Sequence, residues 1–81
     1  MGVADMRAAF NAVAEPRYSA QKALLRYTQR GGIQMQILEF YGSDAAGAPF
    51  SAKSDPLRPE TDVNLAAAAV AQALLDKDAA K

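Results

Sequence analysis

The chain has no cysteine, no histidine and no tryptophan among its 81 residues. Without cysteine it can form no disulfide bond, and the sequence says nothing about redox compartment. Cysteine and histidine supply the usual ligands of zinc, copper and iron, so a metal site would have to rely on oxygen ligands. The same two residue types carry most proton transfer and nucleophilic chemistry at neutral pH. We therefore predict that the protein is not an enzyme and uses no cofactor.

Long hydrophobic runs are also missing. The longest apolar-rich stretch without charge, Val63–Leu75, contains Asn64 and Gln72 and is too short to cross a bilayer. The first residues, Met1–Arg7, lack the basic start and apolar core of a secretory signal. We expect no membrane span and a cytoplasmic location, with export by a route that needs no signal peptide left open.

Charge balances over the whole chain but not within it. The nine cations and nine acids cancel, yet residues 1–32 carry five cations and two acids, while residues 33–81 carry four cations and seven acids. Such asymmetry fits either a basic binding face or two complementary parts of one fold. At this length we expect one small domain, residues 1–81. Its core is thin, so self-association would add buried surface.

Two segments have the pattern of helices at the ends of the chain. Residues 3–14 repeat apolar side chains at spacings of three and four, and Pro16 ends this helix. Residues 62–78 form an alanine-rich helix that Thr61 or Asp62 caps. Apolar side chains on several sides of this second helix indicate that other elements surround it.

Residues 18–30 also predict a helix, which Ser19 caps and Gly31 ends. At helical spacing, Lys22, Arg26 and Arg30 form one basic ridge, separate from the apolar stripe of the same helix. The ridge can be a solvated face, one that pairs with acids of residues 33–81, or a surface that contacts a partner.

The apolar segment 33–41 has two readings. Ile33, Met35 and Ile37 alternate with glutamines as in a strand, but Leu38 breaks the alternation. We favour a helix, which groups Ile33 and Ile37 with residues 40 and 41. A lone strand would need a partner, either residues 48–51 or the same segment of a second subunit. Residues 42–60, rich in glycine, proline, serine and aspartate, predict a long loop.

The fold class that follows is mainly α, a small bundle of three to four helices with the long loop 42–60. The alternative is an α+β domain in which residues 33–41 form a strand paired across a dimer.

Motifs of known chemistry are incomplete in this chain. Ser19–Lys22 matches the S-x-x-K spacing, but its companion motifs are absent. Gly42–Gly47 superficially suggests a phosphate-binding loop, but lacks the Gly-Lys-Ser/Thr ending. The same stretch lacks the alternating carboxylates of a calcium loop. We interpret both motifs as ordinary structure, a helix cap and a turn.

The basic ridge and the apolar segment together form the candidate partner-binding surface. It comprises nine residues: Tyr18, Lys22, Leu25, Arg26, Arg30, Ile33, Ile37, Phe40 and Tyr41. A charged face beside contiguous apolar surface is typical of an interaction site. We predict a non-enzymatic protein–protein interaction module, such as an adaptor, a regulator or a small subunit of a larger assembly. The alternative is a nucleic-acid-binding protein that uses the basic ridge, because cations at regular spacing can neutralise phosphates.

Overall fold

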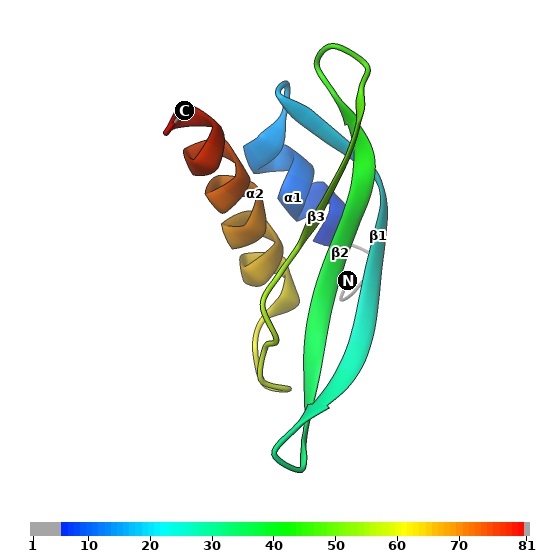
Figure 1. Ribbon diagram of the computed structural model, residues 1–81, viewed down its shortest axis with the longest axis vertical. Helices are drawn as coiled ribbons and strands as arrows, with labels where there is room; N and C mark the ends of the chain where they lie inside the picture. The colour runs from blue at the N-terminus through cyan, green and yellow to red at the C-terminus, as the bar shows by residue number, and fades with distance from the viewer. Residues whose placement is uncertain (1–5, 81) are drawn as a thin grey trace.

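The protein folds as a three-stranded antiparallel sheet with two helices on one side (Figure 1). The computed structural model describes residues 6–80. The elements follow the order α1 (Met6–Ala14), β1 (Tyr18–Arg30), β2 (Ile33–Asp44), β3 (Pro49–Lys53) and α2 (Val63–Ala79). Strand β2 lies between β1 and β3, so the whole sheet is built from neighbours in the chain.

Strands β1 and β2 form a long hairpin closed by Gly31 and Gly32. Both glycines have positive φ angles, 56° and 80°, and the flanking Arg30 and Ile33 pair across the strands. A two-residue turn with two left-handed residues matches the right-handed twist of a hairpin, and glycine adopts it without steric cost. The hairpin tip extends well past the helices (Figure 1). The strand register shifts once, between Ala20 and Lys22, which leaves Gln21 as the extra residue of a bulge.

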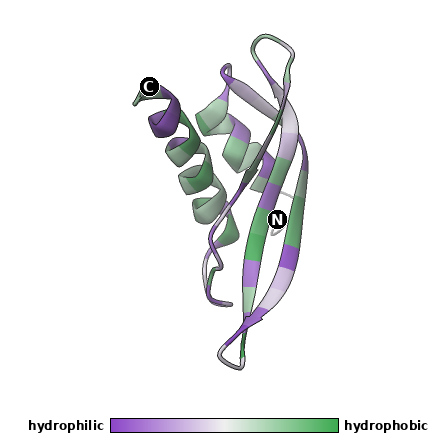
Figure 2. Cartoon of the chain, viewed as in Figure 1, coloured by the Kyte–Doolittle hydropathy of each residue, from purple (hydrophilic) through white to green (hydrophobic). Residues whose placement is uncertain are grey.

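The core lies between the sheet and α1, with α2 packed against it. Phe10 from α1 stacks on Phe40 of β2 at a ring-centroid distance of 4.4 Å, and Phe50 of β3 lies 6.0 Å from the same ring. The fully buried set is Met6, Phe10, Ala14, Ala20, Leu38, Phe40, Ala67 and Ala71. The buried residues of α1 and α2 recur every four positions, and the alanines of α2 let that helix approach closely. Hydrophobic colour follows α2 and the middle of β2 (Figure 2).

The side chain of Asn11 closes the free edge of β1 near the bulge. Its Oδ1 accepts a hydrogen bond from Ala20 N at 2.7 Å, and its Nδ2 donates to Ala20 O at 3.0 Å. The amide of Asn11 therefore satisfies both backbone groups of a fully buried residue, as a neighbouring strand would.

This α+β architecture shows that the expected bundle of three to four helices is wrong. Residues 18–30 form strand β1 instead of a helix, and residues 33–41 lie within strand β2. Of the two partners considered for a strand at 33–41, the same segment of a second subunit is wrong, whereas residues 48–51 overlap β3, which pairs with β2 on the side opposite β1. The expected loop 42–60 contains the end of β2 and all of β3. The two terminal helices coincide with α1 and α2, except that residues 3–5 lie outside the described part of the chain.

The high helix propensity of its residues explains why β1 was predicted to be a helix. Its sequence is rich in alanine, leucine, glutamine, lysine and arginine, which favour helix in isolation. Pairing with β2 along the whole hairpin outweighs that weak local preference. The two glycines Gly31-Gly32 are a hairpin signal in their own right, and interpreting Gly31 as a helix stop hid it.

Candidate functional site: the basic face of the sheet

The strand register divides the hairpin residues between a covered and an uncovered face. Residues directly opposite each other in an antiparallel pair point to the same side. Ala23 with Phe40 and Leu25 with Leu38 face the helices and the core. The intervening pairs therefore face away from both helices: Lys22 with Tyr41, Leu24 with Glu39, Arg26 with Ile37, Thr28 with Met35, and Arg30 with Ile33.

This uncovered side, which we call the basic face, carries most of the charge of the sheet. Lys22, Arg26 and Arg30 follow β1 at intervals of four residues, and Lys53 of β3 lies opposite Glu39 on the same side. All four cationic residues are exposed. At about 3.3 Å per residue, the row on β1 spans about 26 Å. Glu39 is the one acid that the three strands place there, so the face has an excess of three positive charges.

An apolar strip runs beside the cations. Leu24, Met35, Ile37 and Tyr41 are half-buried, and Ile33 near the hairpin tip is 45% exposed. No element of residues 6–80 covers this strip, because both helices lie on the other side of the sheet (Figure 1). A strip of this kind flanked by cations suits a ligand that is both anionic and partly apolar.

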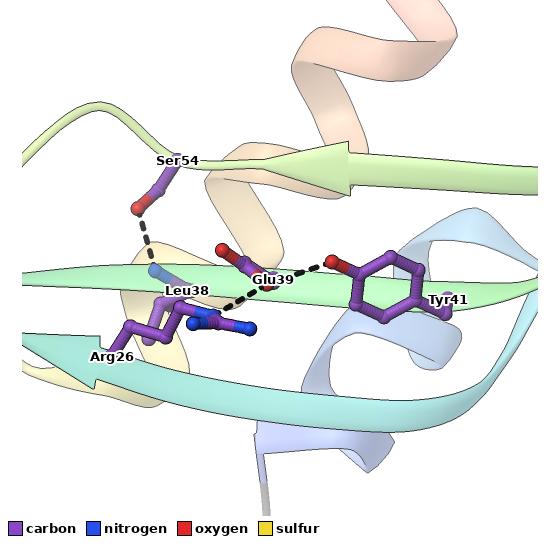
Figure 3. Close-up of polar contacts among 5 residues, drawn as sticks. All are labelled: Arg26, Leu38, Glu39, Tyr41 and Ser54. Carbon is purple, nitrogen blue, oxygen red and sulfur yellow. Dashed lines mark hydrogen bonds and ion pairs between the residues drawn. The ribbon is translucent and has the colours of Figure 1, made fainter.

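Glu39 is held in the middle of the basic face by two neighbours. Its Oε1 accepts a hydrogen bond from Arg26 Nε at 2.9 Å and another from the Tyr41 hydroxyl at 2.7 Å (Figure 3). Only 5% of Glu39 is exposed, whereas 62% of the Arg26 side chain is exposed. Glu39 therefore fixes Arg26 and Tyr41 while its own charge is shielded from solvent.

These contacts lower the pKa of Glu39 and raise the pKa of Tyr41. The hydrogen bond from Tyr41, together with the guanidinium of Arg26, lowers the pKa of Glu39 below its ordinary 4.5 despite desolvation. The same hydrogen bond raises the pKa of Tyr41 above its ordinary value. On the other side of the sheet, the hydrogen bond that Tyr18 donates to Asp78 raises the pKa of Tyr18.

The lowered pKa of Glu39 predicts a specific loss of stability in acid. A carboxyl whose pKa is lower in the folded state stabilises the fold above its unfolded pKa, and this contribution is lost as pH falls through the folded pKa. We expect the urea midpoint of the wild type to decline below pH about 4.5, and Glu39→Gln to decline less over the same range. Urea unfolding followed by circular dichroism between neutral pH and acid measures this difference.

Glu60→Gln serves as the control for that titration, because it removes an exposed carboxyl from the loop before α2. Its midpoint should follow the wild-type curve. Superimposable curves for Glu39→Gln and the wild type would show that the Glu39 contacts contribute nothing to the loss of stability in acid.

The structure distributes the nine predicted binding residues over both sides of the sheet. Six lie on the basic face: Lys22, Arg26, Arg30, Ile33, Ile37 and Tyr41. The other three face the helices, where Leu25 and Phe40 join the core and Tyr18 packs its ring 4.9 Å from that of Phe50. A spacing of four residues places side chains together on a strand as well as on a helix, which is why the cations remain grouped although the element differs.

Leu24, Met35 and Lys53 belong to the basic face but were not predicted. The alternation of Ile33, Met35 and Ile37 would have included Met35 had the strand reading been preferred. Lys53 comes from β3, a five-residue strand inside the expected loop, and no sequence pattern linked it to residue 39.

Comparison with known proteins found no matching family model, no matching curated protein and no matching solved structure. Within residues 6–80, no helix is long and apolar enough to cross a membrane. The same residues contain no cluster of three or more histidine, cysteine, aspartate or glutamate side chains placed to hold a metal ion.

Proposed function

We propose that the protein binds single-stranded nucleic acid on the basic face of its sheet. The observation that carries the proposal is the arrangement of four exposed cations around an apolar strip on a sheet face that no described element covers. Cations that neutralise phosphates release counterions and supply most of the affinity for a nucleic acid.

The geometry favours an extended strand as ligand. The row from Lys22 to Arg30 follows one β-strand at intervals of about 13 Å, so it can contact spaced phosphates of a nucleic-acid strand laid along β1. Sugars and bases would then lie over Leu24, Ile37 and Met35, while the ring of Tyr41 offers a stacking surface. The sequence-based alternative assigned nucleic-acid binding to these cations on a helix, and the proposal assigns it to the same cations on strand β1.

A protein–protein role remains a prediction for the same face. An acidic protein surface could engage the same cations, and the apolar strip would suit it as well. The nucleic-acid proposal is preferred because the cations form an evenly spaced row, which matches a polymer with one charge per repeat.

Binding of a fluorescein-labelled twelve-nucleotide oligo-dT or oligo-U, followed by anisotropy, tests the proposal. Affinity should fall with salt with a slope of about −0.7 per neutralised phosphate for a single strand. The double variant Lys22→Ala/Arg30→Ala should reduce this slope by about 1.4 and weaken binding roughly tenfold to a hundredfold at low salt. Arg26 is left intact, because it also contacts Glu39.

The matched control is Arg58→Ala/Lys77→Ala, which removes the same charge from the loop and from α2, away from the basic face. It should bind like the wild type. Absence of binding at low salt, or an equal loss in both double variants, would overturn the proposal. Displacement of the oligonucleotide by poly-glutamate at equal charge concentration would assign the face to an acidic protein instead.

A further inference from the structure

The free edge of β3 and the neighbouring helix α2 enclose a groove that the basic face does not include. Among residues 6–80, strand β3 is the outer strand of the sheet and pairs only with β2. A groove of about 510 Å³ separates it from α2, which lies alongside β3 in Figure 1. Its volume falls in the range of ordinary ligand sites, roughly 300–1,000 Å³.

One wall of the groove offers unpaired backbone groups. Ser54 N donates to Leu38 O at 2.9 Å, and Asp44 N donates to Ala48 O at 2.8 Å, so the even-numbered residues between them direct their backbone groups toward β2. In an antiparallel ladder the alternate residues direct theirs the opposite way. The N–H and C=O groups of Ser51 and Lys53 therefore point toward the groove.

The other wall is apolar and has a flat surface. Val70 and Leu74 of α2 and Leu57 of the preceding loop line the groove, and Ala66, Ala69 and Ala73 leave space between them. Alternate side chains of an added strand would point into this space, where branched aliphatic groups fit between the alanines. Backbone pairing along one wall and apolar packing along the other are the two requirements of peptide binding by strand addition.

The charges around the groove select among possible occupants. Lys77 of α2 lines the groove on the helix side, Lys53 borders it with its side chain on the basic face, and Asp55 is the one acid among the lining residues. A second copy that paired with β3 would place its own basic face, with an excess of three positive charges, next to this one, and like charges repel. We infer that the groove binds an extended peptide that pairs with β3, inserts aliphatic side chains at alternate positions and carries an acidic residue beside Lys77.

A labelled peptide acetyl-Ser-Val-Thr-Val-Thr-Glu-Gly, in which the two valines and the glutamate point toward α2, tests this inference by anisotropy titration. Replacing the threonine between its two valines with proline removes a backbone N–H that faces β3 and should weaken binding at least tenfold. Ala73→Gln, which fills the groove from an exposed position, should have a similar effect. Ala79→Gln, also exposed on α2 but outside the groove, should bind like the wild type.

Charge exchange provides the second arm of the test. Lys77→Glu should weaken binding of the glutamate peptide several-fold and strengthen binding of the same peptide with lysine in place of glutamate. No binding at millimolar peptide, or equal binding to wild type and Ala73→Gln, would overturn the inference. A dimer at micromolar concentration that Ala73→Gln dissociates would assign the groove to a second copy of the chain. Neither arm depends on nucleic-acid binding, so the two proposals stand or fall separately.

Discussion

Phe10→Ala should leave little folded protein at 37 °C. Phe10 is completely buried, and its ring stacks on that of Phe40 and lies 6.0 Å from that of Phe50, so truncation opens a cavity where α1 meets the sheet. Removing a buried phenylalanine costs about 3–5 kcal/mol. Domains are stable by about 5–15 kcal/mol, and one this small lies toward the lower end. Urea unfolding at 25 °C and thermal melting measure the loss.

Leu65→Ala is the control for this truncation. Leu65 is also a large apolar residue within a helix, but it is 72% exposed. Its replacement should change the free energy of unfolding by no more than about 0.5 kcal/mol. Similar losses for the two variants would contradict the placement of the core between α1 and the sheet.

Gly42→Ala should destabilise the protein by about 3 kcal/mol, the upper end of the usual cost of overpacking. A Cβ atom at Gly42 would overlap the carbonyl oxygen of Ser19 and approach Ala20 Cα to 2.9 Å. These are backbone atoms, and the side chain of Asn11 holds Ala20 in place, so they cannot move aside cheaply. The variant must shift β1 at the bulge. Equilibrium unfolding in urea measures its cost.

Gly47→Ala separates crowding from backbone strain. Gly47 has a φ angle of 86°, but a Cβ atom there would meet no other atom within 4 Å. Its replacement should cost only the left-handed penalty of about 1–2 kcal/mol. If Gly42→Ala proves no more destabilising than Gly47→Ala, the close approach of β1 to β2 at Gly42 is not as described.

The two helices could be predicted from the sequence alone. Helical periodicity located α1 and α2, because their apolar residues recur at three and four positions and their ends carry recognisable stop or cap residues. Asp62, one of two expected caps, accepts hydrogen bonds from Asn64 N and Leu65 N. Such signals are local, so the sequence contains them in full.

Strand pairing is not local, and there the prediction failed. Leu24 and Leu25 are adjacent apolar residues in β1, one on each side of the sheet, which obscures the alternation that identifies a strand. The bulge at Gln21 shifts the alternation again near the start of β1. The grouping of the cations could nevertheless be predicted, because their spacing of four residues is even. Which face they occupy depends on where α1 and α2 pack, and no pattern within β1 contains that information.

The Asn11 contact makes the two edges of the sheet unequal. At Ala20 a side-chain amide already occupies the place of a neighbouring strand, and the cations from Lys22 to Arg30 repel a second copy of β1 along the remaining edge. Addition of a strand is thus favoured at β3 over β1. Because the β1 edge is disfavoured, strand addition between copies at β3 would join at most two chains and would not continue into a fibril.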